Sequence, residues 1–149
     1  MTHRYIGTKE VVAWPAEKDG AEGYGVKYAD GYISWSPKAA FDEAYRTSEP
    51  GMEQALNFGD ALHYLKLGKK VARAGWNGKG MWLIMVPGTV DAKLNDGTPY
   101  QRALDSNICE ILPHIDMWTV NAQGRRAMLP GWMASQTDML SEDWLVLIA

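Results

Sequence analysis

The sequence predicts an α+β fold, with small antiparallel sheets and one main helix in a C-terminal domain and a small ββα-like module before it. Three patterns predict this: an Asp-Gly hairpin signal near residue 30, one amphipathic helical period near residue 60, and short apolar runs that read as strands. The 149 residues, 46% of them apolar, suffice for one domain plus a small module. We expect the module to span 1–50 and the domain 51–149.

The module's main signal is the stretch at 24–35. Asp30-Gly31 is a dipeptide typical of two-residue hairpin turns. With that turn, Val26 faces Trp35 across the hairpin, and the two share one apolar face.

A strand and a helix flank this hairpin. Residues 11–14 read as a short strand that ends at Pro15. After the hairpin, Ser36 is a good N-cap and Pro37 suits the first helical position, which predicts a helix to about Tyr45.

The domain's main helix begins after Asn57. Asn57 reads as its N-cap, with Asp60 three residues later, and Gly68 reads as its C-terminal cap. Four apolar residues have the spacing of one helix face. They are Phe58, Ala61, Leu62 and Leu65.

Strands are expected after this helix. Val71 and 81–86 flank a glycine-containing turn at 77–80, and 81–86 is apolar on both faces. Such a strand is either central and covered twice, or buried against another subunit. Residues 91–112 fit a short helix or a loop with a strand. Three further strands are expected at 115–120, 125–129 and 144–148.

Composition excludes several classes of function. The net charge of −3 argues against binding of a nucleic-acid polymer by bulk electrostatics. The apolar runs are too short to span a membrane, and the N-terminus lacks a signal-peptide core. One cysteine, Cys109, allows no intramolecular disulfide and fits a reducing cytoplasm.

Catalytic patterns are weak. His3, His63 and His114 are scattered, so no metal site is expected. No phosphate-binding glycine motif of the Walker or Rossmann type occurs, and no cofactor is expected. Asp138 and Asp143 could form an acid pair with Glu142, although a turn before the last strand explains these residues as well.

A ligand site is suggested around Trp76. Its indole could stack on a purine, and the following Asn77 supplies donors beside glycines that let a backbone approach phosphate. Arg73 and Lys79 add positive charge there. The competing interpretation is an ordinary hairpin turn whose tryptophan belongs to the core.

Two blocks, NFGDALHYLKLGKKVARAGWNGKGMWLIMVPG at 57–88 and LPGWMASQTDMLSEDWLVL at 129–147, resemble the small phage proteins that counter the Thoeris antiviral system by sequestering its signal. This is the second of two sponge types. The resemblance implies homotetramers that bind glycocyclic ADP-ribose in pockets between subunits, with cyclic dinucleotides as a second ligand class in some members. It places ligand contacts on five residues of this chain: Trp76, Ser135, Gln136, Thr137 and Asp138. On chemical grounds we add Arg73, Asn77 and Trp132.

These observations lead to one hypothesis: a non-enzymatic phage anti-defence protein that traps a nucleotide signal in the cytoplasm of the infected host. It would assemble as a homotetramer and need neither nucleic-acid polymer nor membrane as partner. Two alternatives stay open. One is a hydrolase of such a signal with Asp138 or Asp143 as base, and the other is a structural phage oligomer without ligand.

Overall fold

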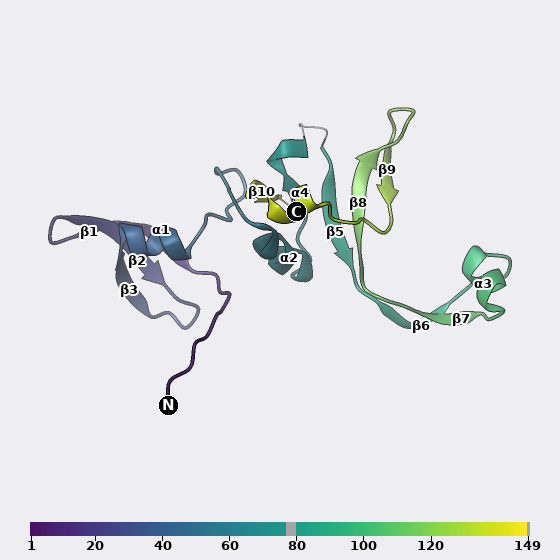
Figure 1. Cartoon of the computed structure of the whole chain (residues 1–149), viewed down its shortest axis with the longest axis horizontal. Coiled ribbons are helices and arrows are strands. Elements are labelled where there is room, and N and C mark those ends of the chain that lie inside the picture. Colours follow the sequence, from purple (N-terminus) through teal and green to yellow (C-terminus); the bar gives the residue numbers. More distant parts are fainter. Residues whose placement is uncertain (77–79, 149) are drawn as a thin grey trace. The chain divides into compact units, whose positions relative to one another are not determined.

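The computed structural model of the chain describes residues 1–76 and 80–148, which form two compact units, Met1–Arg46 and Thr47–Ala149. Both units combine short helices with small antiparallel sheets, so the predicted α+β class is confirmed (Figure 1). No helix in the described residues is long and apolar enough to cross a membrane.

The first unit is a three-stranded antiparallel sheet with one helix. Its elements are β1 (Val12–Lys18), β2 (Ala21–Lys27), β3 (Ile33–Pro37) and α1 (Lys38–Ala44), and the strand order is β1-β2-β3. Lys18 pairs with Ala21, so Asp19 and Gly20 form a two-residue turn, both with positive φ (51° and 80°). That conformation matches the twist of the two strands it joins.

Two expectations for the strands of this unit are wrong. The predicted end of the first strand at Pro15 fails because β1 is an edge strand, where a missing N–H costs no ladder hydrogen bond. The predicted register at Asp30-Gly31 is off by one, because the turn contains three residues and Val26 pairs with Ser34. Trp35 therefore lies on the opposite face of the sheet from Val26.

Helix α1 covers one face of this sheet. The ring of Phe41 stacks on Tyr24 from β2 at 4.2 Å and on Tyr45 at 4.9 Å between centroids. The helix begins one residue later than predicted, because Pro37 ends β3 and serves as N-cap without a side-chain bond. Ser36 does not cap it.

The second unit is built on a five-stranded antiparallel sheet in the order β10-β4-β5-β8-β9. Its strands are β4 (Val71–Arg73), β5 (Trp82–Val86), β8 (His114–Val120), β9 (Arg126–Leu129) and β10 (Trp144–Val146), with helices α2 (Phe58–Lys66) and α4 (Gln136–Leu140) and a 3₁₀ turn, η1 (Ala74–Trp76). Residues 77–79, which include the predicted ligand residue Asn77, lie outside the described residues.

A two-stranded ribbon is inserted in the chain between β5 and β8, which pair directly with each other in the sheet. It consists of β6 (Thr89–Lys93) and β7 (Ile108–Ile111), joined through α3 (Pro99–Leu104) (Figure 1). The stretch 91–112 therefore contains both alternatives, a short helix and a strand.

Helix α2 has the predicted caps. Asn57 and Asp60 form a reciprocal capping box. At the other end Gly68 has φ 81°, its N–H donates to Leu65 O, and Lys69 N–H donates to Tyr64 O, which closes the helix as a Schellman motif. Local sequence thus sets both ends of this helix.

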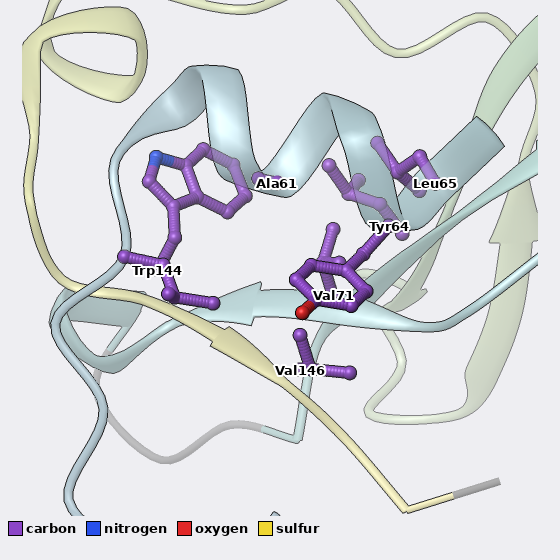
Figure 2. Packing of buried hydrophobic residues seen from close by; sticks show 8 residues of the cluster. Ala61, Tyr64, Leu65, Val71, Trp144 and Val146 are labelled. Carbon is purple, nitrogen blue, oxygen red and sulfur yellow. The ribbon is translucent and has the colours of Figure 1, made fainter. Parts of the chain in front are cut away.

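The core lies between α2 and one face of the sheet. Trp144, Val71 and Leu83 project from three strands and are fully buried, and Figure 2 shows Trp144, Val71 and Val146 beneath Ala61, Tyr64 and Leu65 of the helix. All four predicted apolar residues contribute, Ala61 and Leu65 by burial and Phe58 and Leu62 by packing against the core. The ring of Phe58 lies 5.5 Å from that of Trp144 between centroids.

Strand β5 is the centre of the sheet and has two unequal faces. Leu83 and Met85 face the core under α2. Trp82, Ile84 and Val86 point the other way, are half-buried, and no helix of the second unit's described residues packs over them. Trp82 stacks on Trp118 of β8 at 5.8 Å between centroids. This outer sheet face is mainly apolar, and register also places Asp116 and His114 on it, opposite Ile84 and Val86.

Candidate functional site

An aromatic cluster lies at one end of the sheet, where β10, η1 and the loop before α4 meet. Trp144 is its buried centre, and its Nε1–H donates to Asp138 O at 3.0 Å. The rings of Trp76 and Trp132 meet it edge to face, at 5.5 and 6.3 Å between centroids. Edge-to-face pairs of this kind stabilise packing by about 0.5–1.5 kcal/mol each. Trp76 and Trp132 keep part of their surface exposed.

Arg73 of β4 joins two distant acidic residues beside this cluster. Its Nη1 donates to Asp138 Oδ1 at 2.7 Å, and its Nε donates to Asp143 Oδ1 at 2.9 Å. The Arg73 and Asp138 side chains are each 12% exposed, so solvent screens this pair little. One planar guanidinium therefore links β4, α4 and the start of β10.

Asp138 has three roles at once. Its Oδ2 accepts from Ser135 N–H, while Ser135 Oγ accepts from Asp138 N–H, which is the capping box of α4. Its Oδ1 also accepts from Trp76 Nε1 at 3.4 Å. The carboxylate thus positions the indole, the guanidinium and the first turn of α4.

Asp143 holds the 3₁₀ turn that presents Trp76. Its Oδ2 accepts from Gly75 N–H at 2.8 Å, and its backbone oxygen accepts from Ala74 N–H at 3.0 Å. A Cβ at Gly75 would lie 2.8 Å from Asp143 Oδ2, so this close approach requires glycine. The absence of a side chain at Gly75 therefore lets the Asp143 carboxylate approach the backbone just before Trp76.

Both carboxylates are stabilised in their charged form. The hydrogen bond from Arg73 lowers the pKa of Asp143, and the Gly75 N–H adds to this against the effect of burial. Burial alone would raise the pKa of Asp138, but hydrogen bonds from Ser135, Arg73 and Trp76 outweigh it and lower that pKa. Two carboxylates against one guanidinium leave the cluster with a net negative charge.

The predicted site residues divide into two groups. The structure brings Arg73, Trp76, Trp132 and Asp138 into one network, with Arg73 and Asp138 bonded to each other. Ser135, Gln136 and Thr137 lie next to it with exposed side chains, at the start of α4. Asn77 lies outside the described residues.

Sequence reasoning did not identify the residues that position the others. Gly75, Trp144 and Phe58 were not singled out for the site, and Asp143 was considered only as a base. Arg73 and Asp143 are 70 positions apart and Arg73 and Asp138 are 65 apart, so no local spacing reveals the pairs. The Trp76-Asp138 contact, 62 positions apart, is equally non-local.

Two surface hollows of the described residues lie outside this network. One of about 280 Å³ lies along β10 and is lined by Pro50, Gly51, Met52, Gln54 and residues 145–148, with no charged side chain. It therefore lacks the groups that hold an anion. In the described part of the chain, no group of histidine, cysteine or acidic residues is placed to hold a metal ion.

Two comparisons with known proteins cover the second unit. Residues 56–147 match the family model described as the Thoeris anti-defense 2-like domain. A curated relative, Thoeris anti-defense 2 of Bacillus phage SP01, is 34% identical over 94 residues, which make up 62% of this chain and 96% of the relative. Both Trp76 and the block at 135–138 fall inside the matched range.

Proposed function

Because the chain belongs to the Thoeris anti-defense 2-like family, we propose that it binds a nucleotide immune signal, glycocyclic ADP-ribose, and holds it without degrading it. Cyclic dinucleotides are a second ligand class in this proposal, and the site of action is the cytoplasm of the infected host. The observation that carries the proposal is the contact of a partly exposed Trp76 with Asp138 in the first turn of α4, directly after the exposed polar residues at 135–137.

This placement supplies the two contacts that an adenine nucleotide needs. The open part of the Trp76 indole offers a stacking surface for the base. Ser135, Gln136 and Thr137 offer hydroxyl and amide groups for ribose hydroxyls and phosphate oxygens. Arg73, Trp132 and Asp138 act behind them and hold Trp76 and α4 in position.

Trapping without turnover is supported by the state of the two carboxylates. A general base works best with a pKa near the working pH. Asp138 and Asp143 have lowered pKa values and share Arg73, so each is a poor proton acceptor. This favours a sponge over the hydrolase alternative.

The uncovered sheet face supports assembly into a homotetramer. Trp82, Ile84 and Trp118 belong to a mainly apolar surface of the kind that marks contacts between proteins. The pyrophosphate of the ligand needs cations that the negative Arg73 cluster does not provide. A pocket shared between subunits would supply such cations from a second chain.

The direct test is recovery of the ligand. Purified protein is mixed with glycocyclic ADP-ribose, freed of unbound ligand by filtration and heat-denatured, and the released material is analysed by mass spectrometry. Intact ligand in stoichiometric amount is expected. Progressive cleavage that stops in Asp138→Asn would establish the hydrolase instead, and an oligomer that retains no ligand would leave the structural alternative.

Trp76→Ala tests the stacking contact. Loss of one base-stacking indole should weaken binding by about 1–3 kcal/mol, measured by calorimetry, with the oligomer retained. Tyr100→Ala, an exposed aromatic on α3 away from both the aromatic cluster and the outer sheet face, is the control. Unchanged affinity in Trp76→Ala would exclude Trp76 as a ligand contact.

A further inference from the structure

The sheet of the first unit has one face that α1 does not cover. Helix α1 packs on the face of Tyr24 and Val26. The strand register shows which residues form the opposite face, namely every second residue of each of the three strands. These are Val12, Trp14, Ala16, Lys18, Ala21, Gly23, Gly25, Lys27, Ile33, Trp35 and Pro37. We call this the tryptophan face.

Two indoles lie against the central strand of this face. A Cβ built on Gly25 would be 2.3–2.5 Å from three adjoining ring atoms of Trp14, and one on Gly23 would be 2.5–2.6 Å from two ring atoms of Trp35. Nearly equal distances to several ring atoms mean that each ring lies across the glycine backbone. Both glycines are buried, while Trp14 is 40% exposed. The Trp14 indole therefore turns its other side outward, whereas Trp35 is half-buried with Lys18 Nζ over its ring.

Trp35 is fixed in this position. Its Nε1–H donates to Ala16 O of β1 at 2.9 Å, which ties β3 to β1 across the central strand. An aromatic ring held by the backbone loses little conformational entropy when a ligand stacks on it. The surface is therefore ready for binding before any ligand arrives.

The charges of the tryptophan face have one sign. Lys18 and Lys27 are exposed at opposite ends of the strands, and Lys18 Nζ lies 5.7 Å from the centre of the Trp35 ring. None of the strand positions of this face is Asp or Glu, whereas Glu17 and Glu22 belong to the other face. Aromatic surfaces flanked by cations complement a ligand that alternates planar rings with negative charges.

We propose that the tryptophan face binds single-stranded nucleic acid, with unpaired bases stacked on Trp14 and Trp35 and the phosphates near Lys18 and Lys27. Single strands are the chemistry that fits, because their bases are free to stack on aromatic side chains of a sheet. The net charge of −3 leads to the expectation that no nucleic-acid polymer binds. Net charge, however, governs the long-range attraction between a protein and a nucleic acid. Stacking acts at contact, so this binding is weakly dependent on bulk charge.

The full-length protein is tested with fluorescein-labelled oligothymidylate and oligouridylate of about eight nucleotides, by fluorescence anisotropy. Trp14→Ala should weaken binding about tenfold. Tyr32→Ala, which removes a more exposed aromatic (65% against 40% for Trp14) that lies in the hairpin turn and stacks on Tyr28, should not. Two lysines predict a slope of about −1.4 for log affinity against log salt.

A second pair of variants keeps both indoles, in case Trp14→Ala disturbs the fold. The double charge reversal Lys18→Glu and Lys27→Glu should abolish binding, whereas Lys38→Glu, on α1, should leave it unchanged. The proposal is overturned by absence of binding to both oligonucleotides, by equal affinity of Trp14→Ala and Tyr32→Ala, or by preference for an acidic proline-rich peptide. Ligand recovery from the second unit is a separate measurement and does not depend on this result.

Discussion

Gly75 shows how closely single residues fit around the candidate site. A methyl group there would meet Asp143 Oδ2 at 2.8 Å and Arg73 Nη2 at 3.2 Å, and these two groups hold each other in place. We expect Gly75→Ala to lower the free energy of unfolding by about 1–3 kcal/mol, as overpacking does. Urea denaturation measures this. Gly7→Ala, where a Cβ meets nothing within 4 Å, is the control, and equal stability of the two variants would contradict the contact.

At this scale the sequence predicts residue types better than roles. It selects Trp76, Arg73 and Asp138 as site residues, and the structure joins these three. It assigns both Arg73 and Asp138 to contacts with a ligand, and Asp138 alternatively to catalysis. It misses the ion pair between them, because the two residues are 65 positions apart in the sequence. Such pairing depends on the tertiary fold, and no local pattern encodes it.

Helices α2 and α4 each begin with a capping box, and the two caps can be compared by equivalent substitutions. Asn57 caps α2 and Ser135 caps α4, each through a capping box. Replacing either by alanine should cost about 1 kcal/mol of stability. Only Ser135→Ala should also reduce ligand retention, because it removes both a proposed ligand contact and the cap of α4, which carries Asp138 and, through it, Trp76. Thermal unfolding with ligand recovery separates the two effects. Equal retention in both variants would show that α4 does not shape the site.

The same caps explain which elements the sequence predicts. Helix α2 follows from Asn57, Asp60 and Gly68, because all its end signals lie within a dozen residues. Helix α4 has five residues, too few for an apolar period, and the sequence reads it as irregular with local caps. The hairpin at 30–31 has the wrong predicted register because Asp-Gly also fits a longer turn, in which Tyr32 N–H donates to Asp30 Oδ1.

For the second unit as a whole, the Arg73 cluster links strands and helix and should make stability depend on acid. Asp138 and Asp143 have lowered pKa values in the folded state. Their contribution is therefore complete above the ordinary value of 3.8 and is lost as the pH falls through the lower folded pKa. We expect the melting temperature to fall steeply below about pH 4.

Asp143→Asn should be less stable than the wild type at neutral pH and lose less on acidification. Glu142→Gln, at the exposed neighbouring position, should follow the wild type. Melting curves recorded by circular dichroism between neutral and strongly acidic pH provide the comparison. Parallel curves for Asp143→Asn and the wild type would mean that the ion pair with Arg73 contributes nothing to folding.

The outer face of the five-stranded sheet sets the expected assembly. An apolar sheet face is stable in water when another layer covers it, and α2 occupies only the opposite face. We expect light scattering to give four times the 16.6 kDa of one chain. Ile84→Lys should reduce this mass, because a charged side chain must lose its hydration to enter an apolar contact, and an ion pair with the cross-strand Asp116 does not recover that cost. Lysine is chosen because Asp116 is the cross-strand neighbour of Ile84, and a second carboxylate there would be repelled.

Met52→Lys replaces an exposed apolar residue outside that face and should leave the mass unchanged. If wild-type protein scatters as a single chain, or if Ile84→Lys keeps the full mass, this face is not the subunit contact. Ligand recovery from Ile84→Lys then decides the composition of the pocket. Loss of retention together with loss of mass, while circular dichroism shows a folded chain, would mean that a second subunit supplies the cations which the Arg73 cluster lacks.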